Sequence, residues 1–320
     1  MNSLVFFCLF IFTLVLCSPP EASAQSHTVR FVFQNRIADV LSLVAIKKGF
    51  FAEEGLIIKP LIFSDGPSTA EALFSGSADI VTMGDAAAII AASRNQNFRI
   101  IASHSTGEHR HRIMVRSDSP LKSFGDLSGK KVGIKKGTST YGGFLAALQK
   151  NNLSLSSVHV LDLSPDVMTN ALFAGSIDAF VASEPTPSAA EEKGARQLAT
   201  LGGLENEYPI LLVTKADWLQ ANRSEAVRFL RALKKAAHFV RENPLETAGI
   251  VSTATGMKAE TAKRAMQIHQ YSLRLDKPIL SSLEKTATFL KDQKTIPAVP
   301  DFSVVTDPAH LAAAIKDSKP

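Results

Sequence analysis

The segment Gly137-Thr138-Ser139-Thr140 has the composition of an anion-binding loop at the start of a helix. The helix predicted to follow it runs to residue 150, and its first turn leaves backbone N–H groups without intrahelical partners. Those amides and the positive end of the helix dipole attract oxyanions, and the hydroxyl groups add neutral donors. The loop therefore suits a sulfonate, phosphate, nitrate or carboxylate. The alternative is an ordinary helix cap, where Ser and Thr are common in any case.

Two segments that begin 99 residues apart carry nearly the same sequence. ALFSGSADIV begins at Ala72, and ALFAGSIDAF begins at Ala171. Each predicts the end of a helix, a glycine that can adopt the left-handed conformation of a helix stop, and a short apolar strand. The period is too long for a solenoid, whose repeats span about 20–50 residues. We therefore expect two similar α/β lobes with a ligand-binding cleft between them.

Strands and helices are predicted to alternate around these motifs up to residue 214. Apolar runs rich in β-branched residues predict strands, and apolar residues at helical spacing predict helices. This order implies sheets of parallel type with helices on both faces. The predicted strands span 27–33, 56–63, 78–83, 98–103, 112–116, 130–135, 157–163, 177–183 and 209–214. The predicted helices span 37–48, 69–74, 86–93, 138–150, 165–173, 224–243, 244–253, 258–268, 279–291 and 308–316, and from residue 217 onward the prediction is helical.

Several phrases in a fixed order carry a resemblance to a known family. They are GFFAEEGL from Gly49, ALFSGSADI from Ala72, SPLKSFGDLSGKKV from Ser119, Gly137-Thr138-Ser139, and Glu184-Pro185. With them, the chain resembles the periplasmic solute-binding proteins of nitrate/sulfonate/taurine-type ABC transporters. That wider family includes binding proteins for thiamine-pyrimidine precursors. The resemblance covers nearly all of the chain after residue 24.

The resemblance implies a two-lobed α/β periplasmic binding protein of type II, in which two crossing strands form a hinge. Lobe 1 would comprise residues 25–112 and 215–320, and lobe 2 residues 113–214. The protein would be a monomer that closes on a small anionic or zwitterionic ligand and delivers it to an ABC permease and ATPase complex, with no reaction, cofactor or metal. Family members often carry Trp before the acidic-Pro pair. Ser183 at that position puts a stacking wall for a bulky aromatic ligand in doubt.

The candidate ligand-binding residues follow predicted strands, because ligands of open parallel sheets bind beyond the carboxyl ends of the strands. Arg36 could close on the anion held at Thr138, and its alternative is a surface arginine. Asp85 could act only as a helix cap. Glu184 could pair with a ligand amine or hydrogen-bond a backbone group of the hinge. The full set is Gln34, Asn35, Arg36, Ser64, Gly66, Gly84, Asp85, Gly137, Thr138, Ser139, Thr140, Ser183 and Glu184.

A basic cluster lies near the first expected crossing strand and consists of His104, His109, Arg110, His111 and Arg112. His109 and His111 alternate on one face of a strand and could supply two metal ligands, but a metal site needs at least a third. We therefore expect a solvated loop and no metal. Protonation of these histidines near pH 6 would still tune the affinity for an anion.

The first 24 residues have the pattern of a cleaved signal peptide. An apolar run over residues 4–16 is too short to span a bilayer, and Ala22-Ser23-Ala24 is a small-residue cleavage site. We therefore expect a periplasmic protein. Lipid anchoring at Cys17 is the less favoured alternative, because Leu16 is bulky for such a site. Both cysteines, Cys8 and Cys17, lie in this leader, so cleavage would remove every thiol.

The charge and motif content narrow the function. The formal net charge is +5 with both signs interspersed, which does not indicate nucleic-acid binding. The favoured function is an extracytoplasmic binding protein for a small anion, an organosulfonate of taurine or alkanesulfonate type, because a hydroxyl-rich helix start suits three oxyanion oxygens. A thiamine-precursor pyrimidine and nitrate are the alternative ligands. An enzyme on the same fold is less favoured, because the enzymes among the relatives rely on a Cys-rich motif. A sensor that feeds a signalling partner is the third alternative.

Overall fold

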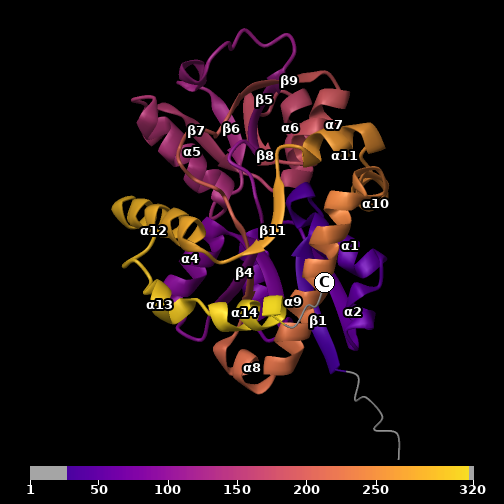
Figure 1. The fold of residues 1–320 in the computed structure, drawn as a ribbon. Coiled ribbons are helices and arrows are strands. Elements are labelled where there is room, and N and C mark those ends of the chain that lie inside the picture. Colours follow the sequence, from indigo (N-terminus) through magenta and orange to yellow (C-terminus); the bar gives the residue numbers. More distant parts are fainter. Residues whose placement is uncertain (1–26, 317–320) are drawn as a thin grey trace, which may run out of the picture.

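A computed structural model describes residues 27–316 and places them in two α/β lobes that lie one above the other (Figure 1). The predicted signal peptide and Cys17 lie outside the described residues. Within residues 27–316, none of the helices combines the length and the apolar character that a membrane span needs.

The first lobe is built on a six-stranded mixed sheet with the strand order β11-β4-β10-β3-β1-β2. β2 and β3 run parallel to β1, whereas β10 is antiparallel to both β3 and β4, and β11 is antiparallel to β4. The strands are β1 (His27–Gln34), β2 (Leu56–Phe63), β3 (Ile80–Gly84), β4 (Arg99–Thr106), β10 (Ile210–Thr214) and β11 (Gln270–Arg274).

Helices cover both faces of this sheet, since apolar side chains of the strands alternate between the two sides. Phe31 and Phe33 of β1 pack on one side, where the ring of Phe229 meets Phe31 edge-on with the centroids 4.9 Å apart. Val32 packs on the other side. The first face carries α1 (Val40–Lys47), α2 (Phe50–Glu53), α9 (Arg223–Glu242), α10 (Pro244–Thr255), α11 (Ala259–Met266) and α14 (Pro308–Lys316). The second carries α3 (Gly66–Phe74), α4 (Asp85–Arg94), α12 (Lys277–Asp292) and α13 (Phe302–Val305).

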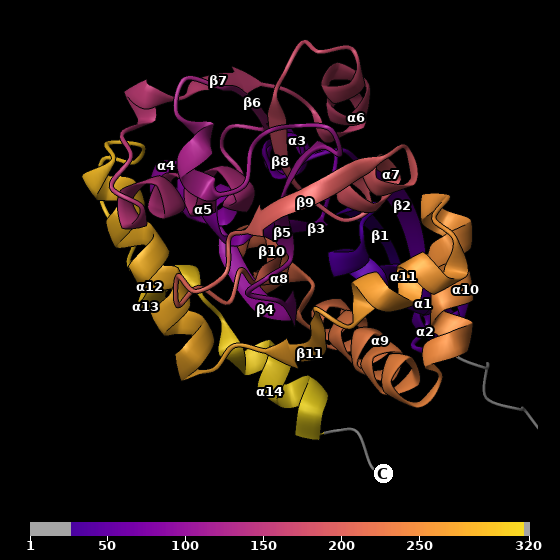
Figure 2. The same ribbon diagram turned by 90° about the horizontal axis from the view of Figure 1, so that it is seen from above.

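The second lobe is built on a five-stranded mixed sheet with the order β7-β6-β8-β5-β9. β6 is parallel to β7 and β8, and β5 is antiparallel to β8 and β9. Helices again pack on both faces (Figure 2). The strands are β5 (His111–Arg116), β6 (Lys131–Ile134), β7 (His159–Asp162), β8 (Ala179–Ser183) and β9 (Ala195–Thr200). The helices of the second lobe are α5 (Ser139–Lys150), α6 (Pro165–Phe173) and α7 (Thr186–Glu192). A further helix, α8 (Ala216–Ala221), belongs to the first lobe. The 3-10 turns are η1 (Ile37–Asp39), η2 (Phe124–Leu127) and η3 (Leu155–Ser157).

The sequence repeat corresponds to a structural repeat. α3 with β3 and α6 with β8 occupy the two copies, and Gly76 and Gly175 both end their helices at a positive φ, +77° and +72°. The aspartate of each copy holds the neighbouring strand in the same way. Asp79 accepts a hydrogen bond from the Arg30 amide at 2.8 Å, and Asp178 accepts one from the Lys131 amide at 2.8 Å. The prediction of two similar lobes is confirmed.

The chain crosses between the sheets at residues 107–110 and again at residues 201–209. The two crossings are joined by a hydrogen bond from the Gly107 amide to the Glu207 carbonyl at 2.9 Å. β10 lies in the six-stranded sheet, whereas the predicted boundary at residue 214 assigns this strand to the second lobe. The five residues of β10 are all buried between β3 and β4. An apolar run of this kind carries no information about which sheet it joins.

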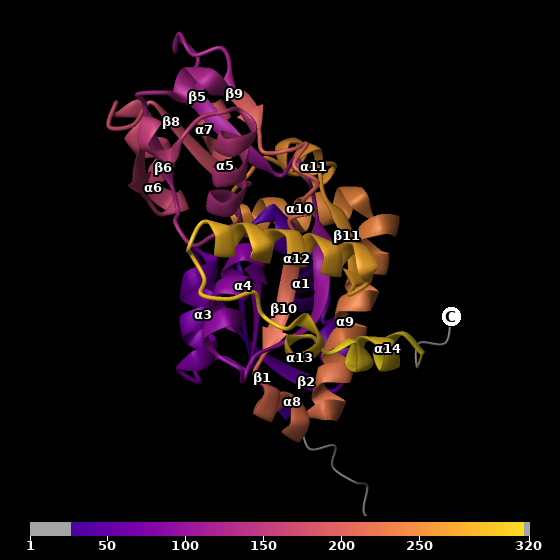
Figure 3. The same cartoon turned by 90° about the vertical axis from the view of Figure 1, so that its left-hand side faces the viewer.

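The last hundred residues depart from the all-helical prediction at one strand. β11 pairs with the edge of β4 and lies close to the crossings (Figure 3). Its side chains are half-buried or exposed, so the sequence lacks the buried apolar run that predicts a strand. β9, which has the same mixed burial at the edge of the second sheet, was not predicted either.

Candidate functional site

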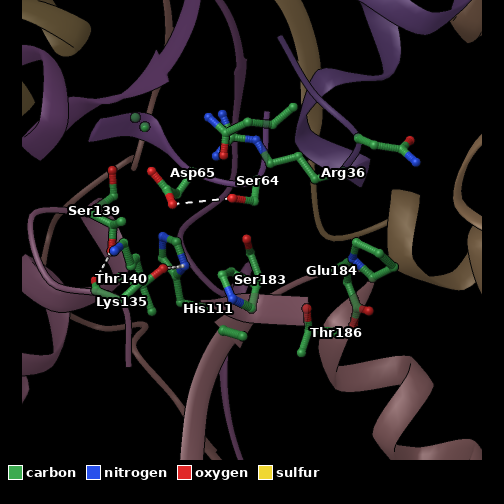
Figure 4. A pocket seen from close by; sticks show the side chains of 18 of the residues that line it. Arg36, Ser64, Asp65, His111, Lys135, Ser139, Thr140, Ser183, Glu184 and Thr186 are labelled. Atoms are coloured by element: carbon green, nitrogen blue, oxygen red, sulfur yellow. Dashed lines mark hydrogen bonds between the residues drawn. The ribbon is translucent and has the colours of Figure 1, made fainter. Parts of the chain in front are cut away.

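A cavity of about 340 Å³ lies between the lobes, where the carboxyl ends of β1, β2, β3, β6 and β8 converge. Figure 4 shows the side chains of Arg36, Ser64 and Asp65 across the cavity from those of Thr140 and Ser183. Of the predicted residues, the first lobe contributes Gln34, Asn35, Arg36, Ser64, Gly66 and Gly84 to the lining. The second lobe contributes Thr138, Ser139, Thr140, Ser183 and Glu184.

Two predicted residues, Gly137 and Asp85, do not line this cavity. Gly137 has a φ of +74°, and a Cβ placed there would lie 3.3 Å from Pro67 Cγ of the opposite lobe. Its role is therefore to make the turn before α5. Asp85 is fully buried, and its carboxylate accepts hydrogen bonds from the Ala86 amide at 2.8 Å and from Asn206 and Thr286 at 3.2 Å.

The start of α5 presents one free hydroxyl to the cavity. Thr138 is the N-cap, because its Oγ1 accepts from the Tyr141 amide at 3.2 Å and donates to the Lys135 carbonyl at 2.7 Å. Thr140 Oγ1 lies 2.8 Å from His111 Nδ1. Ser139 Oγ is buried without a hydrogen-bond partner. The capping alternative thus applies to Thr138, whereas Ser139 is the residue of this loop whose hydroxyl has no partner in the protein.

Two guanidinium groups face the cavity, and the sequence predicts only one of them as a ligand residue. Arg36 is paired through Nε with Asp39, while its Nη2 has no partner. Arg110 is 1% exposed and donates from Nε to the Tyr208 carbonyl at 3.1 Å, while both of its Nη atoms have no partner. Asp39 holds the charge of Arg36 in place. Burial alone would raise the pKa of Asp39, but the positive charge of Arg36 and the nearby ring of His104, 3.4 Å away, lower it to about 2.

The charge of Arg110 is buried without a counter-charge from the described residues, and a bound anion would supply one. Burial lowers the pKa of Arg110 to about 9, and repulsion from Arg36 contributes to the shift. The group is still charged at neutral pH, and no carboxylate contacts it among the described residues. A buried charge without a partner is strongly destabilising. A ligand oxyanion between Arg36 and Arg110 would relieve this penalty and the repulsion between the two arginines.

Glu184 lines the cavity but is engaged with the protein. Its carboxylate accepts from Arg112 Nη1 at 2.7 Å and from the Ser188 amide at 3.1 Å. The alternative of a hydrogen bond to a hinge backbone group does not hold, because the protein partners are a guanidinium of β5 and the first turn of α7. The carboxylate is therefore already neutralised within the second lobe.

The basic cluster is mostly buried, and the prediction of a solvated loop is wrong for three of its members. His104, Arg110 and His111 are each at most 1% exposed, because His104 lies in β4, His111 begins β5, and Arg110 in the first crossing packs on Tyr208 of the second. His109, by contrast, is exposed. Arg110 and His111 both line the cavity. Among residues 27–316, no group of three or more His, Cys, Asp or Glu side chains is placed to hold a metal ion.

Affinity for an anion should not change through protonation of His111 or His269 between pH 5 and pH 8. Burial and repulsion from Arg110 and Arg36 hold the pKa of His111 well below 6.5, which overturns the expected tuning by this residue near pH 6. Burial lowers the pKa of His269 to about 3. Above about pH 9 the unliganded Arg110 loses its proton, so the affinity should fall by up to about tenfold per pH unit. Calorimetric titration across this range, with circular dichroism as a control for folding, tests both parts. A tenfold loss of affinity between pH 6 and pH 7 would contradict the assignment of the pH dependence to Arg110.

Comparison with known proteins adds to this geometry. Residues 40–247 match the model of a family described as NMT1/THI5 like. A Bacillus subtilis (strain 168) protein named as an aliphatic sulfonates-binding protein is 25% identical over 316 residues, which cover 96% of this chain and 95% of that protein. The taurine-binding periplasmic protein of Escherichia coli (strain K12) is 22% identical over 293 residues, covering 86% of this chain and 90% of its own length.

Solved structures share the fold. The alkanesulfonate-binding protein SsuA from Xanthomonas axonopodis pv. citri, bound to MOPS, superposes with a TM-score of 0.82 at 23% identity and covers 88% of this chain and 98% of its own. The desulfurization enzyme DSZB superposes with a TM-score of 0.72 at 17% identity, covering 91% and 99% of the two chains. The predicted two-lobed fold of periplasmic binding proteins is confirmed, and this fold also carries an enzyme.

Proposed function

Because the chain belongs to the NMT1/THI5-like family, we propose that it is an extracytoplasmic solute-binding protein that captures an organosulfonate by lobe closure and passes it to an ABC permease and ATPase complex. The observation that carries the proposal is the convergence of unpartnered donors from both lobes and the first crossing. These are Arg36 Nη2, both Nη atoms of Arg110, and the hydroxyl of Ser139. Sulfonate- and taurine-binding relatives support the ligand class.

The donor set favours an oxyanion over a pyrimidine. A thiamine-precursor pyrimidine would need acceptors and a stacking surface, whereas Ser183 stands where family members often carry Trp. Nitrate, like a sulfonate head group, has three oxygens, but it carries no organic group that could fill the rest of the cavity. A cavity of about 340 Å³ has room for an organic group beyond the head group. Taurine additionally carries an ammonium group, and the pairing of Glu184 with Arg112 removes the acid that was expected to bind it.

The binding step follows from the placement of the donors. The first lobe holds Arg36, the first crossing holds Arg110, and the second lobe holds Ser139 with the start of α5. An oxyanion touches all three only when the lobes are together, so it binds the closed form better than the open form and shifts the population toward it. The closed form is the species that we expect the permease to recognise.

A ligand panel tests the proposal directly. Purified protein should show a higher melting temperature with taurine, ethanesulfonate or MOPS than with chloride, nitrate or a pyrimidine, because ligands that bind only the folded state stabilise it by mass action. Mass spectrometry of ligand released from the denatured protein identifies the natural solute. The proposal fails if no sulfonate shifts the melting temperature. Turnover of a sulfonate or sulfinate would favour the enzyme alternative, for which the DSZB fold is the precedent.

Replacement of Ser139 by Ala should weaken sulfonate binding by about tenfold, the value of one hydrogen bond to a charged group. The unliganded stability should change little, because Ser139 Oγ has no protein partner to lose. Calorimetric titration measures the affinity. Thr138→Ala is the matched control: it removes the N-cap contact with Tyr141 and should lower stability by about 1 kcal/mol while leaving the free donor in place. An unchanged affinity in Ser139→Ala would remove this hydroxyl from the binding site.

A further inference from the structure

We propose that the head-group end of the cavity accepts only fully deprotonated oxyanions, so that it takes sulfonates and rejects phosphonates and other head groups that retain a proton. This inference rests on the proposed function and sharpens its ligand class. It follows from the kind of polar atom that the protein places at that end, and from the way in which it directs its carboxylates elsewhere.

The atoms that gather at the head-group end are mainly donors. A Cβ placed on Gly84 would lie 2.1 Å from Ser139 Oγ and 3.8 Å from Arg110 Nη2, so these two atoms meet beside Gly84. Arg36 is close enough to repel Arg110. A guanidinium group that carries its proton, as both arginines do at pH 6, has no acceptor atom. Gln34 Nε2, also buried without a partner, adds a further donor to the lining.

The carboxylates around the cavity are engaged with protein donors. Asp39 Oδ2 pairs with Arg36, while Asp39 Oδ1 has no hydrogen-bond partner and lies 3.4 Å from His104 Nε2, but Asp39 does not line the cavity. Asp85 accepts from Ala86, Asn206 and Thr286. Glu184 accepts from Arg112 and Ser188, and Asp65 accepts from the backbone and hydroxyl of Ser68 and from Ser64. A P–OH group that enters this site therefore meets no free carboxylate at the two arginines.

The remaining acceptors lie toward the opposite wall. Asn35 Oδ1 has no partner, but its amide is fixed by a 2.5 Å bond from Nδ2 to the carbonyl of Ala254 in α10. Asp166 is exposed in the first turn of α6 and also borders a neighbouring hollow formed with Thr255 and Gly256. These groups would meet the organic part of a ligand. Ser139 Oγ and His111 Nε2 can accept at the head-group end, and their use by a phosphonate is the outcome that would overturn the proposal.

The penalty for a retained proton is that its hydroxyl is buried beside two cations with no free carboxylate to accept it, so that it must compete with the other head-group oxygens for Ser139 Oγ or His111 Nε2. A site built to match one hydrogen-bonding pattern rejects an analogue that mismatches it, and discrimination of 100-fold or more is typical. Ethanesulfonate and ethylphosphonate form a matched pair near pH 6, because both are monoanions of the same shape and only the phosphonate retains a proton. Taurine and 2-aminoethylphosphonate form a second pair with an ammonium tail.

Calorimetric titration of the full-length mature protein with these four compounds is the test. We expect ethanesulfonate to bind about 100-fold or more tightly than ethylphosphonate at pH 6. The preference for taurine over 2-aminoethylphosphonate should be smaller, because the ammonium group lowers the second pKa of that phosphonate and part of it is already fully deprotonated at this pH. If a phosphonate binds weakly, titration in buffers of different ionisation enthalpy should show that a proton is released on binding. Affinities within threefold, without proton release, would overturn this inference and leave the proposed function standing. Failure of both sulfonates and both phosphonates to bind would overturn the proposed function and the inference together.

A substitution provides an independent test. Gln34→Glu adds an acceptor of nearly the same shape to the lining and should weaken ethanesulfonate about tenfold or more through repulsion, while improving ethylphosphonate relative to it at pH 6. Gln96→Glu is the control, because it makes the same change at an exposed residue outside the cavity and should leave the preference unchanged. An unaltered ratio of the two affinities in folded Gln34→Glu protein would contradict the proposal.

Discussion

Replacement of Arg110 by Met should abolish high-affinity sulfonate binding and at the same time stabilise the unliganded protein. Loss of one partner from a buried charged contact typically costs about 2–5 kcal/mol, which corresponds to at least a 30-fold and up to several-thousand-fold weaker ligand. In the empty protein the same guanidinium is fully buried beside Arg36 with two Nη atoms unpaired. Its replacement by a hydrophobic side chain of similar length should therefore raise the free energy of unfolding by about 1–3 kcal/mol. Calorimetric titration and denaturant unfolding measure the two effects.

Arg112→Met is the matched control for this experiment. Arg112 belongs to the same basic cluster, but it pairs with Glu184 and Glu191. Its loss leaves the carboxylate of Glu184 buried without a partner and should lower stability. A rise in stability for Arg110→Met and a fall for Arg112→Met would show that, of these two arginines, only Arg110 lacks a counter-charge within the protein. A fall in stability for Arg110→Met comparable with that for Arg112→Met would contradict this interpretation.

Replacement of Gly84 by Ala should weaken ligand binding by about 10- to 100-fold through a clash that exists only when the lobes are closed. The new Cβ would lie 2.1 Å from Ser139 Oγ and 3.2 Å from Ser139 Cβ, across the gap between the lobes. The φ of Gly84 is −75°, which alanine adopts without strain, so the open protein should fold normally. Small-angle X-ray scattering with and without ligand should show that the variant no longer becomes more compact.

Gly142→Ala is the control at the same boundary between the lobes. A Cβ there would lie 3.5 Å from the Cβ of Ala86, which is an ordinary van der Waals contact. Because alanine also favours the helix in which Gly142 lies, this variant should close on its ligand and be slightly more stable. Equal loss of affinity in both variants would mean that steric closure at Gly84 is not the cause.

Much of the architecture can be predicted from the period of the apolar residues and from the repeated helix-stop motif. β2 and α6 have the predicted bounds, and β3 and β8 occupy equivalent places in the two copies. Sheet membership could not be predicted for β10, because a fully buried strand has the same apolar sequence in either lobe. β9 and β11 were missed because ARQLAT and QYSLR lack the apolar or β-branched run that predicts a strand, whereas the edge strand β2 has one.

The candidate site could be predicted where a loop follows a parallel strand, as at Arg36 and Ser139. It could not be predicted where two distant segments meet. Arg110 lies in a short polar stretch that resembles a solvated loop, and only its contact with Tyr208 on the second crossing shows that it is buried. The repeat in the sequence places Asp85 and Glu184 at equivalent positions, but only Glu184 lines the cavity. Asp85 instead accepts hydrogen bonds from Asn206 and Thr286.

The late position of β10 in the chain has a consequence for the order in which the lobes can form during synthesis. The five strands of the second sheet lie within one uninterrupted stretch, residues 111–200, and can assemble as soon as that stretch is available. The first sheet has a gap at its centre until residues 210–214 arrive, and its edge waits for residues 270–274. The half of the molecule that comes first in the sequence is therefore the half that is completed last, and a chain truncated near residue 205 would contain all five strands of the second sheet but lack the middle strand of the first.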